Sequence, residues 1–167
     1  MKKFKIEFKW AVVIIIIFLA WMTLEKQLGF HDEKLKWQMF FGMLIIIPNF
    51  ILYFLALRDK KKNYYNGEMN WKQGFISGIV ISFIVAIFSP LTQFITYEFI
   101  VPNFFDKMIA LSVESKRLTE EEAKSYFNLS ASIWQNISNG LSYGIVLGAI
   151  VAYILKTKTP VSNPKIK

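Results

Sequence analysis

Apolar residues are concentrated in four long runs along the chain, and short polar segments separate these runs. In a soluble domain, apolar residues are instead spread along amphipathic helices and strands. A run of about 20 apolar residues can cross the hydrocarbon core of a bilayer as a helix. The runs predict spans at about residues 8–28, 39–57, 73–101 and 133–155. The predicted fold class is therefore all-α, an integral membrane four-helix bundle.

The first run follows a basic start, MKKFKIEFK, and a secretory signal peptide begins in the same way. A signal peptide needs small residues at its cleavage site, whereas Trp21 and Met22 occupy the corresponding positions. We therefore expect an uncleaved first span. It reaches membrane length if Lys9 extends its ammonium group to one layer of headgroups and Glu25 lies near the other.

Two prolines lie inside predicted spans. Pro48 lies near the middle of the second span, and we expect a kink there, because neighbouring helices can satisfy the carbonyl group that a proline frees. The third run would extend about 40 Å if straight, so it should tilt or bend at Pro90. Pro102 and Asn103 should end it.

Residues 103–131 form the largest polar segment, which we expect to be extracytoplasmic and partly helical. Its apolar residues recur at helical spacing from Phe104 to Val113, which predicts an interfacial helix up to about Arg117. Thr119 and Glu122 form a capping-box pattern, so a second helix should start there and can run into the fourth span. Residues 1–155 are predicted to be a single membrane domain, and 156–167 a basic, disordered tail.

The Leu57–Gly74 segment, LRDKKKNYYNGEMNWKQG, is predicted to be a basic loop between two spans. With this loop and both termini on one side, that side holds 13 of the 20 Lys and Arg but only 3 of the 12 Asp and Glu. Cytoplasmic segments are enriched in Lys and Arg. We expect a cell (inner) membrane protein with cytoplasmic termini, and the net charge of +8 favours anionic lipid headgroups over nucleic acid as partner.

Small and polar residues form a stripe on each of the last two spans. The third span carries Gly74, Gly78, Ser82, Ala86, Ser89, Gln93 and Tyr97, and the fourth carries Ser132, Asn136, Gly140, Gly144, Gly148 and Ala152. Small residues let helix backbones approach closely in lipid, and the fourth-position repeat is the GxxxG pattern. We expect the two stripes to pack within one chain. The alternatives are a homo-oligomer interface and a pore-lining face.

Few polar residues lie at membrane depth. Asn49, Gln93 and Asn136 should form interhelical hydrogen bonds, and no ionisable residue lies at the predicted mid-plane. His31 is the one histidine, and its loop is expected to be solvated, although a contact with Glu25 stays open. The chain has no cysteine and no recognisable catalytic motif. We therefore predict no metal site, no cofactor and no catalytic residue.

Four stretches of the sequence resemble a bacterial membrane-protein family known only as domain of unknown function four-one-nine-nine. They read LRDKKKNYYNGEMNWKQGFISG, SPLTQFI, WMTLEKQLGFHDE and EEAKSYFNL, and together they extend over nearly the whole chain. The resemblance implies a four-helix integral membrane protein and transfers no catalytic residue. The matching positions that we would test first are Asn66, Gly67, Trp71, Lys72, Gln73, Gly74, Ser89, Pro90 and Gln93.

Three classes of function follow. The leading hypothesis is a structural, accessory or regulatory membrane protein whose 57–74 loop can bind a cytoplasmic partner. The second is a small transporter or channel, which would have to oligomerise because four spans are few for a monomeric pore. The third is an intramembrane enzyme, for which Glu25 and His31 are the only conceivable pair.

Overall fold

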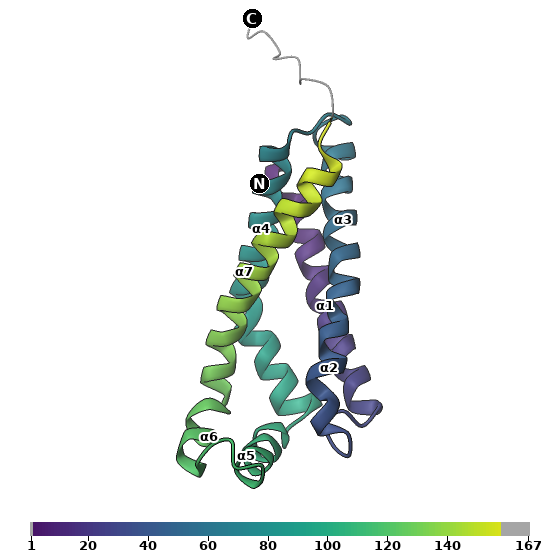
Figure 1. The fold of residues 1–167 in the computed structure, drawn as a ribbon. Helices are drawn as coiled ribbons and strands as arrows, with labels where there is room; N and C mark the ends of the chain where they lie inside the picture. Colours follow the sequence, from purple (N-terminus) through teal and green to yellow (C-terminus); the bar gives the residue numbers. More distant parts are fainter. Residues whose placement is uncertain (1, 158–167) are drawn as a thin grey trace, which may run out of the picture. The chain divides into compact units, whose positions relative to one another are not determined.

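The computed structural model describes residues 2–157, without the Lys2 side chain, and these residues form helices joined by turns, with no strand (Figure 1). Four helical runs are long and apolar enough to cross a membrane: Lys5–Gln27, Leu35–Asn63, Trp71–Ile100 and Leu129–Leu155. The protein is thus an all-α membrane protein, as the sequence predicts. Residues 158–167, most of the tail for which disorder is expected, lie outside the described residues.

The first two runs differ in regularity. A short 3₁₀ turn, η1 (Lys2–Phe4), precedes α1 (Lys5–Gln27), which is one continuous helix. The second run is assembled from η2 (Leu35–Trp37), α2 (Gln38–Gly42), η3 (Met43–Ile45) and α3 (Ile46–Asn63). Pro48 therefore lies in the first turn of α3 instead of the middle of a helix. Its missing N–H removes no hydrogen bond there, because the first turn has no intrahelical acceptor.

The third run continues through Pro90. It consists of α4 (Trp71–Ile95) and a π-helical turn, η4 (Thr96–Ile100). The helix ends before Pro102, as predicted. Two short helices follow, α5 (Phe104–Glu114) and α6 (Glu120–Tyr126), and then α7 (Leu129–Leu155).

The predicted capping box is present at the start of α6, with Thr119 as the N-cap and Glu122 bonding back to it. The expectation that this helix can run into the fourth span is wrong, since α6 ends at Tyr126. The cause is the next polar residue: the Asn128 side-chain oxygen accepts a hydrogen bond from Ala131 N at 2.9 Å and so caps a new helix.

The predicted 57–74 loop is much shorter in the structure, because α3 extends to Asn63 and α4 begins at Trp71. Lysines in the last turn of α3 favour this extension, since cations stabilise a helix C-terminus. Asn66 (φ 52°) and Gly67 (φ 91°) form the left-handed part of the remaining turn. Asn70 and Gln73 then form two reciprocal hydrogen bonds of 2.9 Å, each from a backbone N–H group to the other residue's side-chain oxygen. These bonds form a capping box at the start of α4.

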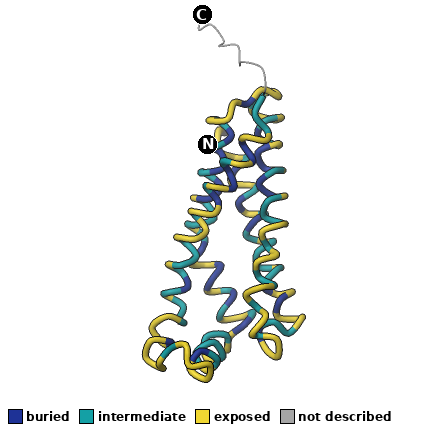
Figure 2. Tube along the Cα trace, viewed as in Figure 1, coloured by how far each residue is buried: buried dark blue, intermediate teal, exposed yellow. Residues whose placement is uncertain are grey.

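The chain divides into two compact units. Unit 1 comprises Met1–Ile14, Ile46–Val85 and Leu141–Lys167, and unit 2 comprises Ile15–Ile45 and Ala86–Gly140. Buried and exposed positions alternate along the long helices, as expected for helices with one protein-facing and one lipid-facing side (Figure 2). Large apolar side chains such as Phe83 and Val146 remain exposed for contact with lipid.

In unit 1, α4 and α7 approach each other at their glycines. A Cβ atom built on Gly78 would lie 2.8 Å from Gly148 Cα, and one built on Gly74 would lie 2.9 Å from Ala152 Cβ. These distances are too short for real Cβ atoms, so the glycines are needed for the close approach. The contacts join two helices of the same chain.

Candidate functional site

Each unit contains a cluster of buried polar side chains, and each cluster is centred on a glutamate of α1. Glu7 belongs to unit 1 and Glu25 to unit 2, and both are only 1 % exposed. Buried carboxylates need partners, because an isolated charge is costly to remove from water. The two clusters differ in how completely their polar atoms find such partners.

The unit 1 cluster joins Glu7 of α1, Lys60 of α3 and Ser77 of α4, all nearly inaccessible to solvent. Lys60 Nζ lies 2.8 Å from Glu7 Oε1 and 3.1 Å from Oε2. Ser77 Oγ donates a hydrogen bond of 2.8 Å to Oε1. Lys60 also donates to the Lys3 carbonyl oxygen and lies 3.8 Å from the centre of the Tyr64 ring. Every charged group in this cluster is thus compensated.

Helix periodicity explains why these charges are buried. Glu7, Ala11 and Ile14 lie on one face of α1 and are all buried. On α3 the buried positions are Leu52, Tyr53, Ala56, Leu57 and Lys60. Lys60 therefore continues the core-facing stripe of its helix and meets Glu7 across the packed interface.

A second ion pair flanks this cluster. Asp59 accepts hydrogen bonds from Lys9, from the Trp10 indole N–H at 2.8 Å and from Asn63 at 2.6 Å. The two pairs attach the start of α1 to the last turns of α3. The sequence predicted that Asp59 and Lys60 belong to a basic loop between two spans, which is wrong, because both residues continue α3 and Lys60 is only 2 % exposed.

The basic segment after Leu57 is held in place by further contacts in unit 1. Lys61 Nζ donates to Leu155 O at 2.8 Å, and the Trp71 indole donates to Ala149 O at 3.1 Å. Met69 and Thr157 exchange two hydrogen bonds, from Met69 N to Thr157 Oγ1 at 2.9 Å and from Thr157 N to Met69 O at 2.8 Å. The exposed cations of this ordered segment are Arg58, Lys62 and Lys72.

The unit 2 cluster surrounds Glu25, in the last turns of α1. Glu25 Oε1 accepts a hydrogen bond from the Trp21 indole at 2.6 Å, and Oε2 accepts one from Gln38 at 3.3 Å. His31 Nε2 lies 3.1 Å from Oε2, so the Glu25–His31 contact that the sequence left open is present. The solvated loop expected for His31 is wrong, because this side chain is 2 % exposed.

His31 has no hydrogen-bond partner within the described residues. Nε2 is close to Glu25 Oε2, but the contact is not aligned as a hydrogen bond, and Nδ1 has no partner either. The ring packs edge-on against Phe104, with centroids 5.4 Å apart. Most buried polar side-chain atoms in proteins are paired, so two unpaired ring nitrogens are unusual.

An ion pair between Asp32 and Lys107 closes the loop around His31. Lys107 also reaches the His31 carbonyl oxygen at 3.5 Å, which links α5 to this loop. The hydrogen bond from Lys107 lowers the pKa of the Asp32 carboxyl below its ordinary value. A small pocket of about 100 Å³ lies between the loop and α5, and His31 lines it.

The other polar stripe residues of unit 2 form hydrogen bonds near the end of α4 and the start of α7. Ser132 Oγ lies 3.1 Å from Gln93 Oε1 and 3.3 Å from Tyr97 Oη. Gln93 is 2 % exposed, and the buried Ser89 carbonyl accepts a hydrogen bond from Thr92. Asn136 instead bonds to the Ser132 carbonyl of its own helix. These contacts form a polar seam between two apolar helices.

The remaining candidate positions are scattered. Asn49 is half-buried in α3, Ala86 is half-buried in α4, and Pro90 is exposed on α4. Gly140 has no atom within 4 Å of a built Cβ, so this part of the α7 stripe is open. These four residues do not join either buried cluster.

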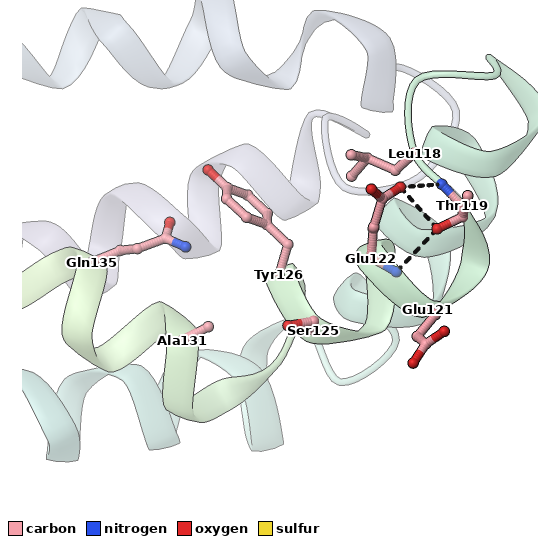
Figure 3. Close-up of a pocket in the computed structure, with 8 residues that line it drawn as sticks. All are labelled: Leu118, Thr119, Glu121, Glu122, Ser125, Tyr126, Ala131 and Gln135. Carbon is pink, nitrogen blue, oxygen red and sulfur yellow. Dashed lines mark hydrogen bonds between the residues drawn. The ribbon is translucent and has the colours of Figure 1, made fainter.

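A wider pocket of about 660 Å³ lies between α6 and the start of α7 (Figure 3). Glu122 points toward Thr119, and this capping contact holds the pKa of the Glu122 carboxyl below its ordinary value. The carboxylate is therefore already used to start a helix.

Within the described residues, no group of three or more His, Cys, Asp or Glu side chains is arranged to hold a metal ion. The two clusters contain residues that sequence analysis missed, chiefly Glu7, Lys60 and Ser77. The stripes of buried positions on α1 and α3 are the signal that could have revealed the first two.

A family model with the description "Protein of unknown function (DUF4199)" matches residues 9–157. This is the family that the sequence resembles, and the match extends over all four candidate spans. No curated protein and no solved structure matches the chain significantly.

Proposed function

Since the chain belongs to this family of proteins of unknown function, whose description assigns no activity, we propose that it is an accessory or regulatory membrane protein, not an enzyme. Its exposed basic surface binds an acidic partner. We define the basic surface as Arg58, Lys62 and Lys72. The location that goes with this proposal is the cell (inner) membrane, with both termini and the basic surface in the cytoplasm.

The proposal rests on one observation: the 57–74 segment, which bears the basic surface, is held in place by hydrogen bonds to the rest of unit 1. Lys61, Met69 and Trp71 form hydrogen bonds with the last two turns of α7 or with Thr157 just beyond it. Lys60 forms a buried ion pair with Glu7. The exposed cations are thus presented from a fixed backbone. A preorganised surface loses less conformational entropy on binding than a flexible loop does.

The partner is expected to be acidic because the surface carries three cations, and the N-terminal segment of the same unit adds the exposed Lys3 and Lys5. Opposite charge speeds encounter and fixes orientation more than it adds affinity. Anionic lipid headgroups contact the same surface in the absence of a protein partner.

A photocrosslinking experiment tests the proposal. Photoreactive residues at the exposed positions 63 and 68 of the full chain in native membranes leave Arg58, Lys62 and Lys72 in place and should capture the same acidic protein. Capture should fall at least about tenfold in the variant R58Q/K62Q/K72Q, because the loss of each surface contact weakens association. The matched control K116Q/R117Q/K124Q removes three cations from the α5–α7 segment and should leave capture unchanged. Robust solute flux by the purified protein, with no protein captured at either position, would refute the proposal.

Topology is measured separately by thiol labelling, because the natural chain has no cysteine to interfere. Single cysteines at Asn63, Asp32 and Ser115 should show the first accessible from the cytoplasm and the other two from the opposite side. Labelling of positions 63 and 32 from the same side would contradict the orientation.

The alternative is a small oligomeric transporter or channel, and the observation that favours it is the polar seam of Gln93, Tyr97 and Ser132. Such a seam lines a path only if several copies assemble around it. Protein that stays monomeric in mild detergent and in bilayers would exclude this alternative.

A further inference from the structure

The pocket beside His31 has the composition of an anion site. Its polar lining residues are Lys26, His31, Asp32, Asn103 and Lys107, and its apolar wall is formed by Val101, Pro102 and Phe104. The volume of about 100 Å³ is enough for a phosphate-sized group. All these residues belong to unit 2.

His31 lines this pocket and has ring nitrogens without hydrogen-bond partners among the described residues. Its side chain is 2 % exposed. A buried polar group without a partner costs free energy, which a ligand oxygen at hydrogen-bond distance would recover. With a proton on each ring nitrogen, Nδ1 can donate to such an oxygen while the Nε2–H group faces the Glu25 carboxylate and balances its charge.

The charges of the lining favour a monoanion. Lys107 is paired with Asp32, whereas Lys26 makes no ion pair in the described part of the chain. The two lysines and one aspartate leave a single excess positive charge. Asp32 would repel a dianion, so a phosphate diester, with one negative charge, fits better than a free phosphate dianion.

A second pocket lies beside the first and has room for an apolar part of the ligand. This pocket, of about 450 Å³, shares Lys26 and Asp32 with the first and is also lined by Thr23, Gln27, Phe99 and Ile100. Phe99 is 70 % exposed and belongs to the π-helical turn that ends the third candidate span. Lys26 is in the last turn of α1, so the two pockets lie where two candidate spans end.

We infer that these two pockets bind one phospholipid molecule. The phosphate diester occupies the His31 pocket and contacts Lys26, Asn103 and Lys107, and an acyl chain runs along Phe99. The site is distinct from the basic surface on unit 1, and it selects for the phosphate group and the acyl chains together. At the ends of membrane spans, a protein surface meets both the phosphate groups and the first part of the acyl chains of the bilayer.

Native mass spectrometry of the full-length protein in neutral detergent tests the inference. Dioleoylphosphatidylglycerol should bind at least about tenfold more tightly than dioleoylglycerol, which has the same chains and no phosphate. K26Q should weaken binding of the phospholipid about fivefold, as expected for one lysine near a headgroup. H31Q should weaken it about tenfold, since a buried donor is lost.

Lys36→Gln is the matched control, because Lys36 is exposed in the same unit and lines neither pocket. The affinity of this variant for the phospholipid should stay within about twofold of wild type. Lys26 is exposed, so K26Q stays informative even if H31Q unfolds. Equal binding of dioleoylglycerol, or unchanged phospholipid binding in both K26Q and H31Q, overturns the inference. Displacement of the phospholipid by millimolar inorganic phosphate overturns it as well, because the ligand would then be free phosphate.

Discussion

Glu7 and Glu25 are two carboxylates on the same helix with the same exposure, yet their surroundings differ. Glu7 is held by a buried lysine and a serine hydroxyl, and its unit packs two helices at glycine contacts. Glu25 faces an imidazole whose nitrogens lack hydrogen bonds, beside a pocket. Burial of an acid is therefore no guide to its role. A closed cluster such as that of Glu7 holds helices together, while an open one such as that of Glu25 keeps bonding capacity for a ligand.

The largest expected effect is at Glu7. Glu7→Gln leaves Lys60 buried without its counter-charge, which should lower the free energy of unfolding by about 3–5 kcal/mol in detergent. The double variant E7Q/K60M should recover most of this loss, because no uncompensated charge remains. Glu68→Gln removes an exposed acid of the same unit and serves as the control. If E7Q unfolds like wild type in a denaturant titration, the ion pair does not hold unit 1 together.

The next effect concerns the packing of α4 on α7. In Gly148→Ala, the new Cβ would lie 3.0 Å from Gly78 Cα, a backbone atom that cannot move alone. We expect a loss of about 1–3 kcal/mol in the free energy of unfolding. Gly140→Ala is two turns away on the same helix, where a Cβ meets nothing within 4 Å. It should be neutral or more stable by up to about 1 kcal/mol, because alanine favours helix. Equal thermal midpoints for the two variants would contradict the close packing.

A smaller effect is expected at the open cluster. Glu25→Gln keeps a carbonyl oxygen that can accept from the Trp21 indole, and no buried lysine loses its partner. The loss in the free energy of unfolding should be about 1–2 kcal/mol, below that of Glu7→Gln. The two variants carry the same chemical change, so each is the control for the other. A larger loss at Glu25 than at Glu7 would reverse the comparison.

The smallest effect is the pH dependence of the Asp32–Lys107 pair. The folded protein lowers the pKa of Asp32 below its ordinary value of 3.8, because Lys107 donates a hydrogen bond to the carboxylate. The pair therefore stabilises the fold above pH 3.8, and this contribution disappears as the pH falls through the folded pKa. The difference in thermal midpoint between wild type and Asp32→Asn should be present at neutral pH and vanish in acid. Asp106→Asn serves as the control, because Asp106 is an exposed acid next to Lys107 that forms no ion pair in the described part of the chain.

The four membrane-length runs and the Thr119 capping box could be predicted from the sequence, because both depend on residues close together in the chain. The pairing of Glu7 with Lys60 could not be predicted in this way. Counting charges by segment treats every lysine as solvated. The helical spacing from Leu52 to Lys60 would have suggested that Lys60 is buried, but only the packing of α1 on α3 shows that Glu7 is its partner.

His31 was beyond sequence reasoning for a different reason. Its loop has no periodicity, so nothing local distinguishes a buried ring from a solvated one. Burial arises from Phe104 and Lys107, which lie more than 70 residues later and cover the loop in the folded unit. Contacts of such sequence separation depend on the helix arrangement, and the apolar pattern alone does not specify it.

The paired hydrogen bonds between Met69 and Thr157 have a consequence for biosynthesis. Thr157 is synthesised 88 residues after Met69. The turn before α4 is therefore fastened only after α7 has been synthesised. A nascent chain that ends before Leu155 would insert its earlier helices while this turn still lacks its hydrogen bonds to Thr157.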